Sequence, residues 1–395
     1  MMRKHAVRCA ALAALALAPA AFGAVTLRAP VYEVIAPGVA YARVEEGTPP
    51  LVFHVVKADL RKRRDGTAIG VEAIKAEGRQ TVAQIADGLV KRRRPLLVAI
   101  NGDFFERDAA NGLPWGVHVH GGELLFSPAG RSAFMVDAQG RPLIAAPALK
   151  IAAKFPAAAG GVKTIAAVNR PRAQDEDGLF LYTPAWGPSA PELPGGMVFT
   201  LSGGAIELGA TVKCTVEEVK SASIATPIPG EGLVLTCDNR TIDAFRRLGL
   251  KSRVEIKGEL APPAAEAVGG GPRIVRAGKP SVETREEKFP QSQAAILVQQ
   301  RHPRAAIGCN QNRTVLILLI VEGRTQASNG VTVPDLAQLM ILLGAHDAMN
   351  LDGGGSATLY VAGRMVTHGG SADAAAQRQV GNAVGIFYYP KGKTG

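Results

Sequence analysis

Residues 350–356 read NLDGGGS, and the segments around this stretch decide the predicted fold of the C-terminal half of the chain. The preceding run, PDLAQLMILLGA, has apolar residues at helical spacing, with Pro334 suited to the first turn and Gly344 to the end of a helix. The run that follows, ATLYVAGRMVTH, indicates two strands joined by a turn. Asp352 is therefore predicted at the end of a short buried strand, where the chain enters a loop.

Three consecutive glycines, at residues 353–355, make this loop a candidate binding site. Backbone without side chains allows N–H groups to approach an oxyanion closely. Asn350, Asp352 and Ser356 add polar side chains around the glycines. A flexible turn between strands is the simpler interpretation, but the polar neighbours favour a site.

A second strand end repeats this arrangement. Residues 96–105 read LLVAINGDFF, an apolar strand that runs directly into Asn101, Gly102 and Asp103. Because functional side chains gather at strand ends along one edge of a sheet, we expect these residues and Asp352 to line the same pocket. The triplet NGD alone also spells an ordinary turn.

The composition favours a β-rich globular protein. Of 395 residues, 47% are hydrophobic and 5% aromatic, with 45 Gly and 26 Pro, which is typical of many short strands and turns. Residues 81–93 have helical spacing. We predict an α+β fold, with a mixed β-sheet core flanked by helices. It forms one domain over residues 25–395, with residues 145–260 as a β-rich insertion or subdomain.

Residues 1–24 are predicted to be a signal peptide. A basic segment, MMRKHAVR, is followed by the apolar run CAALAALALAPA and by small residues suited to cleavage near Ala24. The apolar run is short for a bilayer span, so an uncleaved membrane anchor is the weaker interpretation. We expect a periplasmic or secreted protein without stable membrane insertion.

The net charge of +11 includes two basic runs, RKRR at residues 61–64 and KRRR at residues 91–94. Such runs can bind nucleic acid, but export argues against a nucleic-acid partner. We interpret them as solvated loops and helix ends. Attraction of an anionic polysaccharide or a phosphate-bearing substrate is a secondary interpretation.

The cysteines and histidines give weaker signals. Cys214 and Cys237 lie in strand-like runs and are predicted to form a disulfide in an oxidising compartment, while Cys309 stays reduced. No Cys/His spacing resembles a zinc site. His118 and His120 fall on one strand face, and without a third ligand we prefer a structural role for them over a metal pair.

Six segments follow one another in an order that resembles the phosphodiester glycosidase family, whose bacterial members are often labelled exopolysaccharide biosynthesis proteins. They are AINGDFF, GGGPRIV, HPRAAIG, LIVEGR, NLDGGGSATLYVAG and RQVGNAV, and they cover roughly residues 96–387. Each segment alone is a weak signal, but six in the family's order are specific. The chain departs from the family at Asp103, where a second glycine is common, and at Glu322, where aspartate is common.

The resemblance implies hydrolysis of the bond between a sugar's anomeric carbon and a phosphodiester oxygen, with release of free sugar. It implies Asp352 as the first catalytic carboxylate and Glu322 or Asp103 as the second. It also implies Arg304 and Arg378 as clamps, because a planar guanidinium binds phosphate bidentately. The remaining positions expected to bind phosphate or orient the substrate are Asn101, Gly102, Asn350, Gly353, Gly354, Gly355 and Ser356.

Other interpretations stay open at these residues. Glu322 could simply pair with Arg324, and Arg304 could be a structural partner. A glycoside hydrolase acting on unphosphorylated glycans, or a non-catalytic polysaccharide-binding or export accessory protein, would use the same positions. No cofactor is expected, although Asp103 and Glu322 could hold a hard cation such as calcium together with Asp352.

Overall fold

The computed structural model describes backbone and side chains over most of the chain, namely residues 29–46, 50–62, 65–107, 111–156, 161–173, 176–241, 245, 248–367 and 377–391. At residues 21–22 and 25–26 it describes the backbone alone, as the antiparallel pair β1 (Ala21–Phe22) and β2 (Val25–Thr26). Apart from β1, the predicted signal peptide lies outside the described residues.

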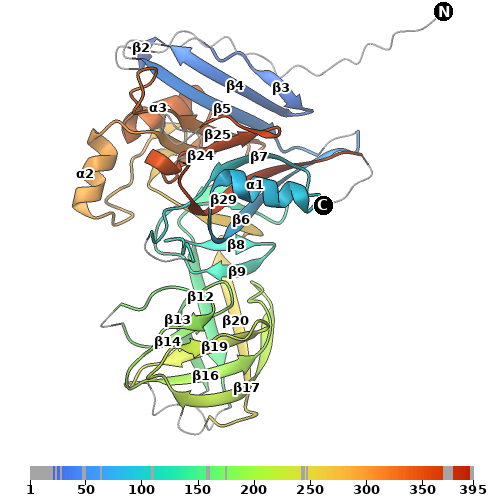
Figure 1. Ribbon diagram of the computed structural model, residues 1–395, viewed down its shortest axis with the longest axis vertical. Coiled ribbons are helices and arrows are strands. Elements are labelled where there is room, and N and C mark those ends of the chain that lie inside the picture. The colour runs from blue at the N-terminus through green and yellow to red at the C-terminus, as the bar shows by residue number, and fades with distance from the viewer. Residues whose placement is uncertain are drawn as a thin grey trace, which may run out of the picture.

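An eight-stranded and a five-stranded sheet form the upper body of the molecule (Figure 1). The larger sheet has the order β23 (Lys279–Pro280), β22 (Arg273–Arg276), β26 (Asp347–Asn350), β24 (Arg304–Cys309), β25 (Val315–Val321), β5 (Leu51–Asp59), β4 (Val39–Glu46), β3 (Glu33–Ala36). The smaller sheet has the order β28 (Arg364–Met365), β27 (Leu359–Val361), β7 (Leu96–Asn101), β29 (Val380–Tyr389), β6 (Ala68–Gln80).

The pairing within both sheets corrects the predicted fold class. Every described strand pair in the two sheets is antiparallel, so the prediction of a mixed core sheet is wrong. Strands hold 47% of the residues and helices 10%, so the α+β class applies only loosely. The protein is mostly β.

The two sheets face each other across a shared core. Leu316, Leu318 and Ile320 of β25 point into the core that β7 and β29 also line, whereas Ile317 and Leu319 face the side of the sheet covered by α3. Because β25 is buried on both faces, its sequence shows no polar alternation. Helix α1 covers the outer face of the smaller sheet. The layers therefore run α1, smaller sheet, larger sheet, α3.

Two of the three described helices begin where the sequence predicts them. In α1 (Val82–Lys91) the side chain of Thr81 caps the first turn, and in α3 (Val333–Leu342) Thr332 does the same, each as half of a reciprocal capping box. Helix α2 (Gln291–Gln299) is absent from the sequence prediction. Its one buried residue is Leu297, so it carries no apolar stripe that a helical period could reveal.

A closed seven-stranded barrel lies below the two sheets and is joined to them through a five-stranded connecting sheet (Figure 1). The barrel has the order β12 (Ala148–Lys154), β13 (Val162–Val168), β14 (Leu179–Tyr182), β19 (Gly232–Cys237), β16 (Met197–Ser202), β17 (Thr211–Ser221), β20 (Arg253–Ala261). The connecting sheet has the order β11 (Pro142–Ala145), β10 (Ala133–Val136), β21 (Glu266–Gly269), β8 (His118–His120), β9 (Glu123–Phe126). The strands β15 (Ser189–Ala190) and β18 (Thr226–Pro227) form a short antiparallel pair of their own. In sequence, β15 lies between β14 and β16, and β18 lies between β17 and β19. The barrel occupies nearly the segment for which the sequence predicts a β-rich insertion.

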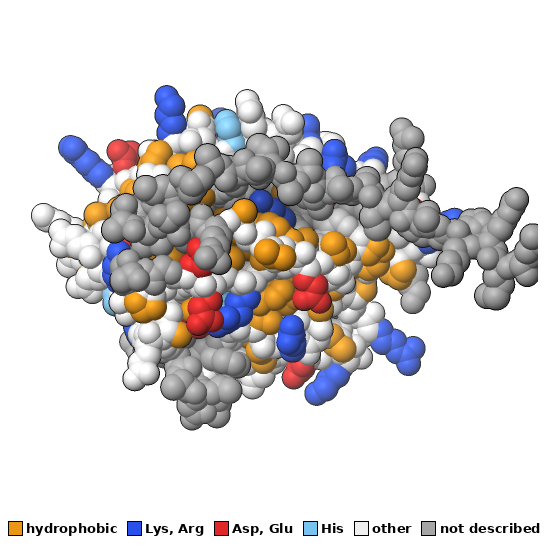
Figure 2. All heavy atoms as spheres, turned by 90° about the horizontal axis from the view of Figure 1, so that it is seen from above, with side chains coloured by type: hydrophobic (Ala, Val, Ile, Leu, Met, Phe, Trp, Pro, Cys, Tyr) orange, Lys and Arg blue, Asp and Glu red, His pale blue; other side chains and the backbone are white. Residues whose placement is uncertain are grey.

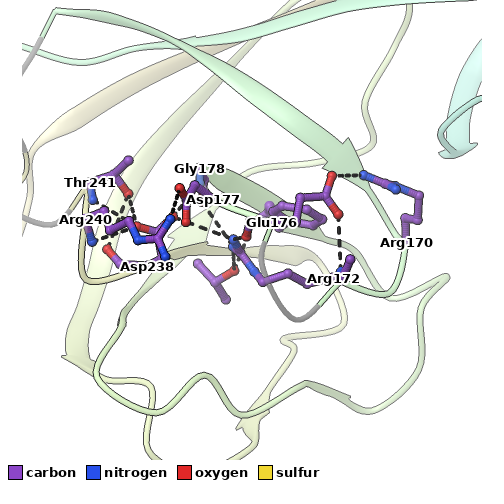
Figure 3. A network of polar contacts seen from close by, with 11 residues as sticks. Arg170, Arg172, Glu176, Asp177, Gly178, Asp238, Arg240 and Thr241 are labelled. Carbon is purple, nitrogen blue, oxygen red and sulfur yellow. Dashed lines mark hydrogen bonds and ion pairs between the residues drawn. The ribbon is translucent and has the colours of Figure 1, made fainter.

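A polar network ties the segments around β14 and β19 together (Figure 3). The guanidinium carbon of Arg172 lies 3.9 Å from the ring centroid of Phe180, and its N–H groups donate to main-chain carbonyls, including that of Gly178 at 3.1 Å. The Asp238 carboxylate accepts backbone N–H groups from Gly178 and from Arg240. The charged groups of this network satisfy one another, which indicates a structural role.

The predicted disulfide does not form. Cys214 lies on β17 and Cys237 on β19, and these strands flank opposite sides of β16, so two strand spacings, roughly 10 Å, separate them. A bridge needs Cα atoms within about 7 Å. Cys214, Cys237 and Cys309 are buried free thiols, and burial raises the pKa of the first two to about 11.

The surface at the upper end of the molecule is partly apolar. Val31 and Val34, beside and within the edge strand β3, are 89% and 69% exposed. Figure 2 shows this end of the molecule from above, with apolar side chains grouped between acidic and basic ones. Among the described residues, no helix is both long and apolar enough to cross a membrane.

Candidate active site

The loop that carries Asp352 joins the two facing sheets. It leaves β26 of the larger sheet and enters β27 of the smaller one, and the buried amide of Asn101, at the end of β7, holds it at both ends. The side-chain N–H of Asn101 donates to the carbonyl of Asp352 at 2.7 Å, and its oxygen accepts the N–H of Thr358 at 3.1 Å. The N–H of Asp352 donates to the carbonyl of Gly102 at 3.0 Å. The two predicted strand ends therefore meet.

Asp103 lies beside this loop, buried in closely packed surroundings. Its backbone N–H donates to the Asn382 side chain at 2.8 Å, and its carboxylate accepts the N–H of Gly116 at 2.6 Å. A Cβ at Gly102 would stand 2.3 Å from the Asn382 oxygen, and one at Gly269 would stand 2.4 Å from the Asp103 carboxylate. Glycine is required at both positions because any side chain there would displace the Asn382 amide or the Asp103 carboxylate.

Burial dominates the ionisation of Asp103. Its side chain is 2% exposed, and desolvation raises its pKa to about 7. Bonds from the N–H groups of Gly116 and Phe104 and the charge of Arg131 act in the opposite direction, and the negative charge of Asp352 raises the pKa further. Asp103 therefore holds a proton over a substantial part of the time at neutral pH.

Asp352 is buried as well, and burial is again the largest influence on its ionisation. Desolvation raises its pKa, while the Ser356 hydroxyl and the positive charges of Arg378 and Arg107 act to lower it. Two carboxylates that share one buried site do not ionise together easily, so one of the pair tends to keep a proton. Arg131 acts on Asp103, whereas Arg378 and Arg107 act on Asp352, so the two carboxylates have different cationic neighbours.

The glycine loop makes room for arginines. A Cβ on Gly355 would stand 3.0 Å from the Arg378 guanidinium, and one on Gly354 would stand 3.4 Å from a terminal nitrogen of Arg324. The N–H of Gly354 donates to the carbonyl of Pro303 at 2.8 Å and is thus used within the protein. The N–H of Gly353 acts on the Asp352 carboxylate. Two of the three glycine N–H groups thus already have partners within the protein, and the loop does not present three free N–H groups to an anion.

Three arginines act on the charges at the loop. Arg378 is half-buried, and burial together with the like charges of Arg107 and Arg324 lowers its pKa, while Asp352 acts to raise it. Arg324 also contacts His302, with 3.2 Å between a guanidinium nitrogen and the ring Nδ1. The sequence predicts Arg378 but misses Arg107 and Arg324, although Arg324 stands in the segment LIVEGR that supplied a predicted site residue.

Arg304 packs against the glycine loop with its Cδ, which lies 3.7 Å from the place of a Cβ on Gly353, but its guanidinium donates to backbone carbonyls outside the loop. Its Nε donates to the carbonyl of Val331 at 3.1 Å, and one terminal nitrogen donates to those of Leu297 and Gln300 at 3.1 and 2.9 Å. The side chain is 3% exposed. Arg304 therefore anchors the end of α2, and the expectation that its guanidinium converges with that of Arg378 on the loop is not met.

Glu322 belongs to a different hydrogen-bonded chain. Its carboxylate lies 2.7 Å from Nε2 of His54, whose Nδ1 lies 2.8 Å from the Tyr41 hydroxyl. It does not join Asp103 and Asp352 in a ligand set. Within the described residues, no group of three His, Cys, Asp or Glu side chains could hold a metal ion.

The histidine pair and the remaining predicted residues also take definite places. His118 is buried beside Asn382, and His120 pairs with Glu266, so the two do not converge. Asn350 is 1% exposed and donates to the carbonyl of Gly271 at 2.9 Å. Ser356 is buried next to Asp352. The buried cluster around Asp352 thus gathers most of the predicted residues from the two strand ends.

Comparison with known protein families gives a match to phosphodiester glycosidases over residues 217–387. Residues 217–387 of this chain therefore belong to the phosphodiester glycosidase family. The match includes the loop of Asp352 with Glu322 and Arg378, whereas Asn101 and Asp103 precede it.

Two solved structures are similar to this chain in fold, and one further protein is similar in sequence over a short segment. A solved protein from Synechocystis without assigned function is 23% identical with a TM-score of 0.71, covering 91% of this chain and 64% of its own. A predicted exported protein of Burkholderia pseudomallei K96243 is 22% identical with a TM-score of 0.64, covering 86% of this chain and 74% of its own. The prophage-derived protein YomE of Bacillus subtilis is 38% identical over 68 residues, 17% of this chain and 10% of YomE. The chain thus spans under two thirds of the Synechocystis protein and a tenth of YomE.

The coupling of the two carboxylates can be measured directly. We expect the Asp103 carboxyl signal to titrate near pH 7 in carbon NMR. In Asp352→Asn the titration midpoint of Asp103 should fall to lower pH, because the negative charge of Asp352, which favours protonated Asp103, is gone. Asp87→Asn, on the exposed side of α1, is the control and should leave it unchanged. A midpoint that stays at its wild-type value in Asp352→Asn would show that the carboxylates are independent.

Proposed function

We propose that this protein is an exported glycosidase that hydrolyses sugar-1-phosphodiester bonds of surface or extracellular polysaccharide. The observation that carries the proposal is a pair of buried, coupled carboxylates, Asp103 and Asp352, beside three arginines. The family supplies the reaction class, and the site supplies the groups that such a reaction needs.

The charge of the site favours a phosphodiester over an unphosphorylated glycan. Arg107 and Arg324 act on Arg378 as like charges, which disfavours its positive form, and a bound anion would offset this effect. Asp352 supplies one negative charge. A phosphodiester supplies another, and its oxygens accept charge-assisted hydrogen bonds from guanidinium groups. A neutral glycan would leave the excess positive charge uncompensated.

The two carboxylates would divide the chemistry. Asp103, protonated near neutral pH, donates its proton to the leaving phosphate oxygen as the C1–O bond breaks. A phosphomonoester has a second pKa of about 6, so an acid with a pKa of about 7 is matched to it. Asp352, ionised, either attacks C1 or removes a proton from the attacking water. Water supplies the new hydroxyl at C1, and the second product is a phosphomonoester.

The two other interpretations of the site fit less well. Glycan hydrolysis without phosphate does not use the arginine group. A passive polysaccharide-binding protein gains nothing from burying two coupled carboxylates, because each buried charge costs folding free energy. Export follows from the predicted signal peptide and is supported by the structural likeness to a predicted exported protein.

Asp352→Asn tests the catalytic carboxylate. The amide keeps the shape and removes the charge, so we expect turnover of a sugar-1-phosphodiester to fall by roughly 10²–10⁴-fold. Binding of a sugar-1-phosphate, measured by calorimetry, should survive or improve because a negative charge near phosphate is removed. Turnover near the wild-type rate would remove Asp352 from the mechanism.

Arg324→Gln and Arg304→Gln form a matched pair. Charge-assisted hydrogen bonds contribute about 1.5–3 kcal/mol, so Arg324→Gln should raise KM for the phosphodiester by about tenfold or more. Arg304→Gln should instead lower the melting temperature, because buried carbonyls would lose their hydrogen-bond donor. The KM of the folded variant should stay unchanged. The opposite pattern would return the phosphate clamp to Arg304.

A further inference from the structure

Among the described residues, several buried polar side-chain atoms around the carboxylate pair have no hydrogen-bond partner, and four of them belong to one group of neighbouring side chains. These four are Nε1 of Trp115, Nη1 of Arg131, Oε2 of Glu287 and Oδ1 of Asn350. Glu287 is 4% exposed and Asn350 is 1% exposed. An unpartnered buried donor or acceptor costs about 1–3 kcal/mol, so four in one region indicate a place prepared for a polar ligand.

Aromatic rings hold the donors in place. The Arg131 guanidinium carbon lies 4.1 Å from the ring centroid of Phe289 and 5.4 Å from that of Trp115. Phe104 stacks on Trp115 with 5.6 Å between centroids and meets Phe289 edge-on at 6.2 Å. No ion pair within 4.0 Å joins Arg131 to Asp103 or Glu287, although both carboxylates act on its charge. The guanidinium is thus oriented by ring stacking and keeps unused N–H groups.

The acceptors connect to the same region through the segment of Gly271. A Cβ on Gly271 would stand 2.3 Å from Oε2 of Glu287 and 3.4 Å from the Phe289 ring. The carbonyl of Gly271 accepts the side-chain N–H of Asn350 at 2.9 Å, which leaves the Asn350 oxygen unused. Glu287 is fixed by its other oxygen, which accepts from Ser132 at 2.6 Å.

The region adjoins the carboxylates. Trp115 directly precedes Gly116, whose N–H donates to Asp103 at 2.6 Å. Asp103 and Glu287 are the two carboxylates with a marked electrostatic effect on Arg131. The charge of Arg131 in turn acts to lower the pKa of Asp103. Asn350 precedes the Asp352 loop by one residue. A ligand that contacts the four atoms therefore lies next to the proton that Asp103 holds.

We propose that Trp115, Arg131, Glu287 and Asn350 form a subsite that reads the hydroxyl groups of a sugar ring. The proposal rests on the proposed function, for which this subsite would bind the glycosyl part of the substrate. A sugar hydroxyl both donates and accepts, so it matches two free donors and two free acceptors, and the apolar face of a pyranose packs on aromatic rings. A phosphate group accepts only, and Glu287 would repel it.

Tryptophan fluorescence can test the subsite without catalysis. The chain has two tryptophans, and the other, Trp186, donates its ring N–H to the Ser189 carbonyl at 3.1 Å in the barrel region. Trp186→Phe therefore leaves Trp115 as the sole reporter. We expect at least one of glucose, mannose, galactose and their 2-acetamido derivatives to give a saturable change in emission below about 100 mM. In the single variant Trp115→Phe, the emission of the remaining Trp186 should not change when the sugar is added.

Glu287→Gln in the Trp186→Phe background is the second variant. It keeps the shape and replaces one free acceptor, so we expect affinity for the active sugar to fall about tenfold or more. Glu259→Gln, on an exposed position of barrel strand β20, is the matched control and should leave affinity unchanged. Near-ultraviolet circular dichroism confirms that each variant is folded. Trp115→Phe keeps an aromatic ring, so it remains informative if Glu287→Gln does not fold.

The outcomes separate this inference from the proposed function. A flat titration with every sugar in Trp186→Phe overturns the subsite, whose polar atoms would then bind only water. Hydrolysis of a sugar-1-phosphodiester with kcat and KM unchanged in Trp115→Phe and Glu287→Gln also overturns it, while leaving the proposed function intact. Saturable sugar binding at Trp115 without hydrolysis supports the subsite and removes the proposed function.

Discussion

The amide of Asn101 is the interaction on which the rest of the site depends. It bonds the backbone on both sides of the glycine loop and so fixes where the larger sheet passes into the smaller one. Each bond contributes about 1 kcal/mol net, but an unpaired buried partner costs about 1–3 kcal/mol. Because Asp352 follows β26 directly, its position is set by the core packed between two sheets and not by a mobile loop.

The site combines two costly features that compensate each other in part, since Arg378 and Asp352 each favour the charged form of the other. Buried carboxylates resist ionisation, as the raised pKa values of Asp103 and Asp352 show. Arginines gathered around a loop without side chains resist one another. An anionic substrate would relieve the second cost, while the shared environment leaves one carboxylate protonated. Preorganised charge of this kind is how an enzyme stabilises a transition state without reorganising itself.

The sequence predicts the strand ends and α3 because apolar period, proline, glycine and capping residues are local signals. It cannot distinguish Arg304 from Arg324, since both border matched segments, and only tertiary packing turns Arg304 toward α2. The Cys214–Cys237 prediction fails for the same reason, because strand order within the barrel is a long-range property. The glycines of the loop are predicted, but their function differs: they admit guanidinium groups instead of presenting N–H groups.

The proposed reaction breaks the bond at the sugar carbon and not at phosphorus. Hydrolysis of a sugar-1-phosphodiester in water enriched in oxygen-18 tests this claim most directly. The phosphomonoester is the informative product, since the C1 hydroxyl of a free sugar exchanges with water. The carboxylate pair predicts a phosphomonoester without label, as water attacks at C1. Label in the phosphomonoester would place the attack at phosphorus and contradict the roles given to Asp103 and Asp352.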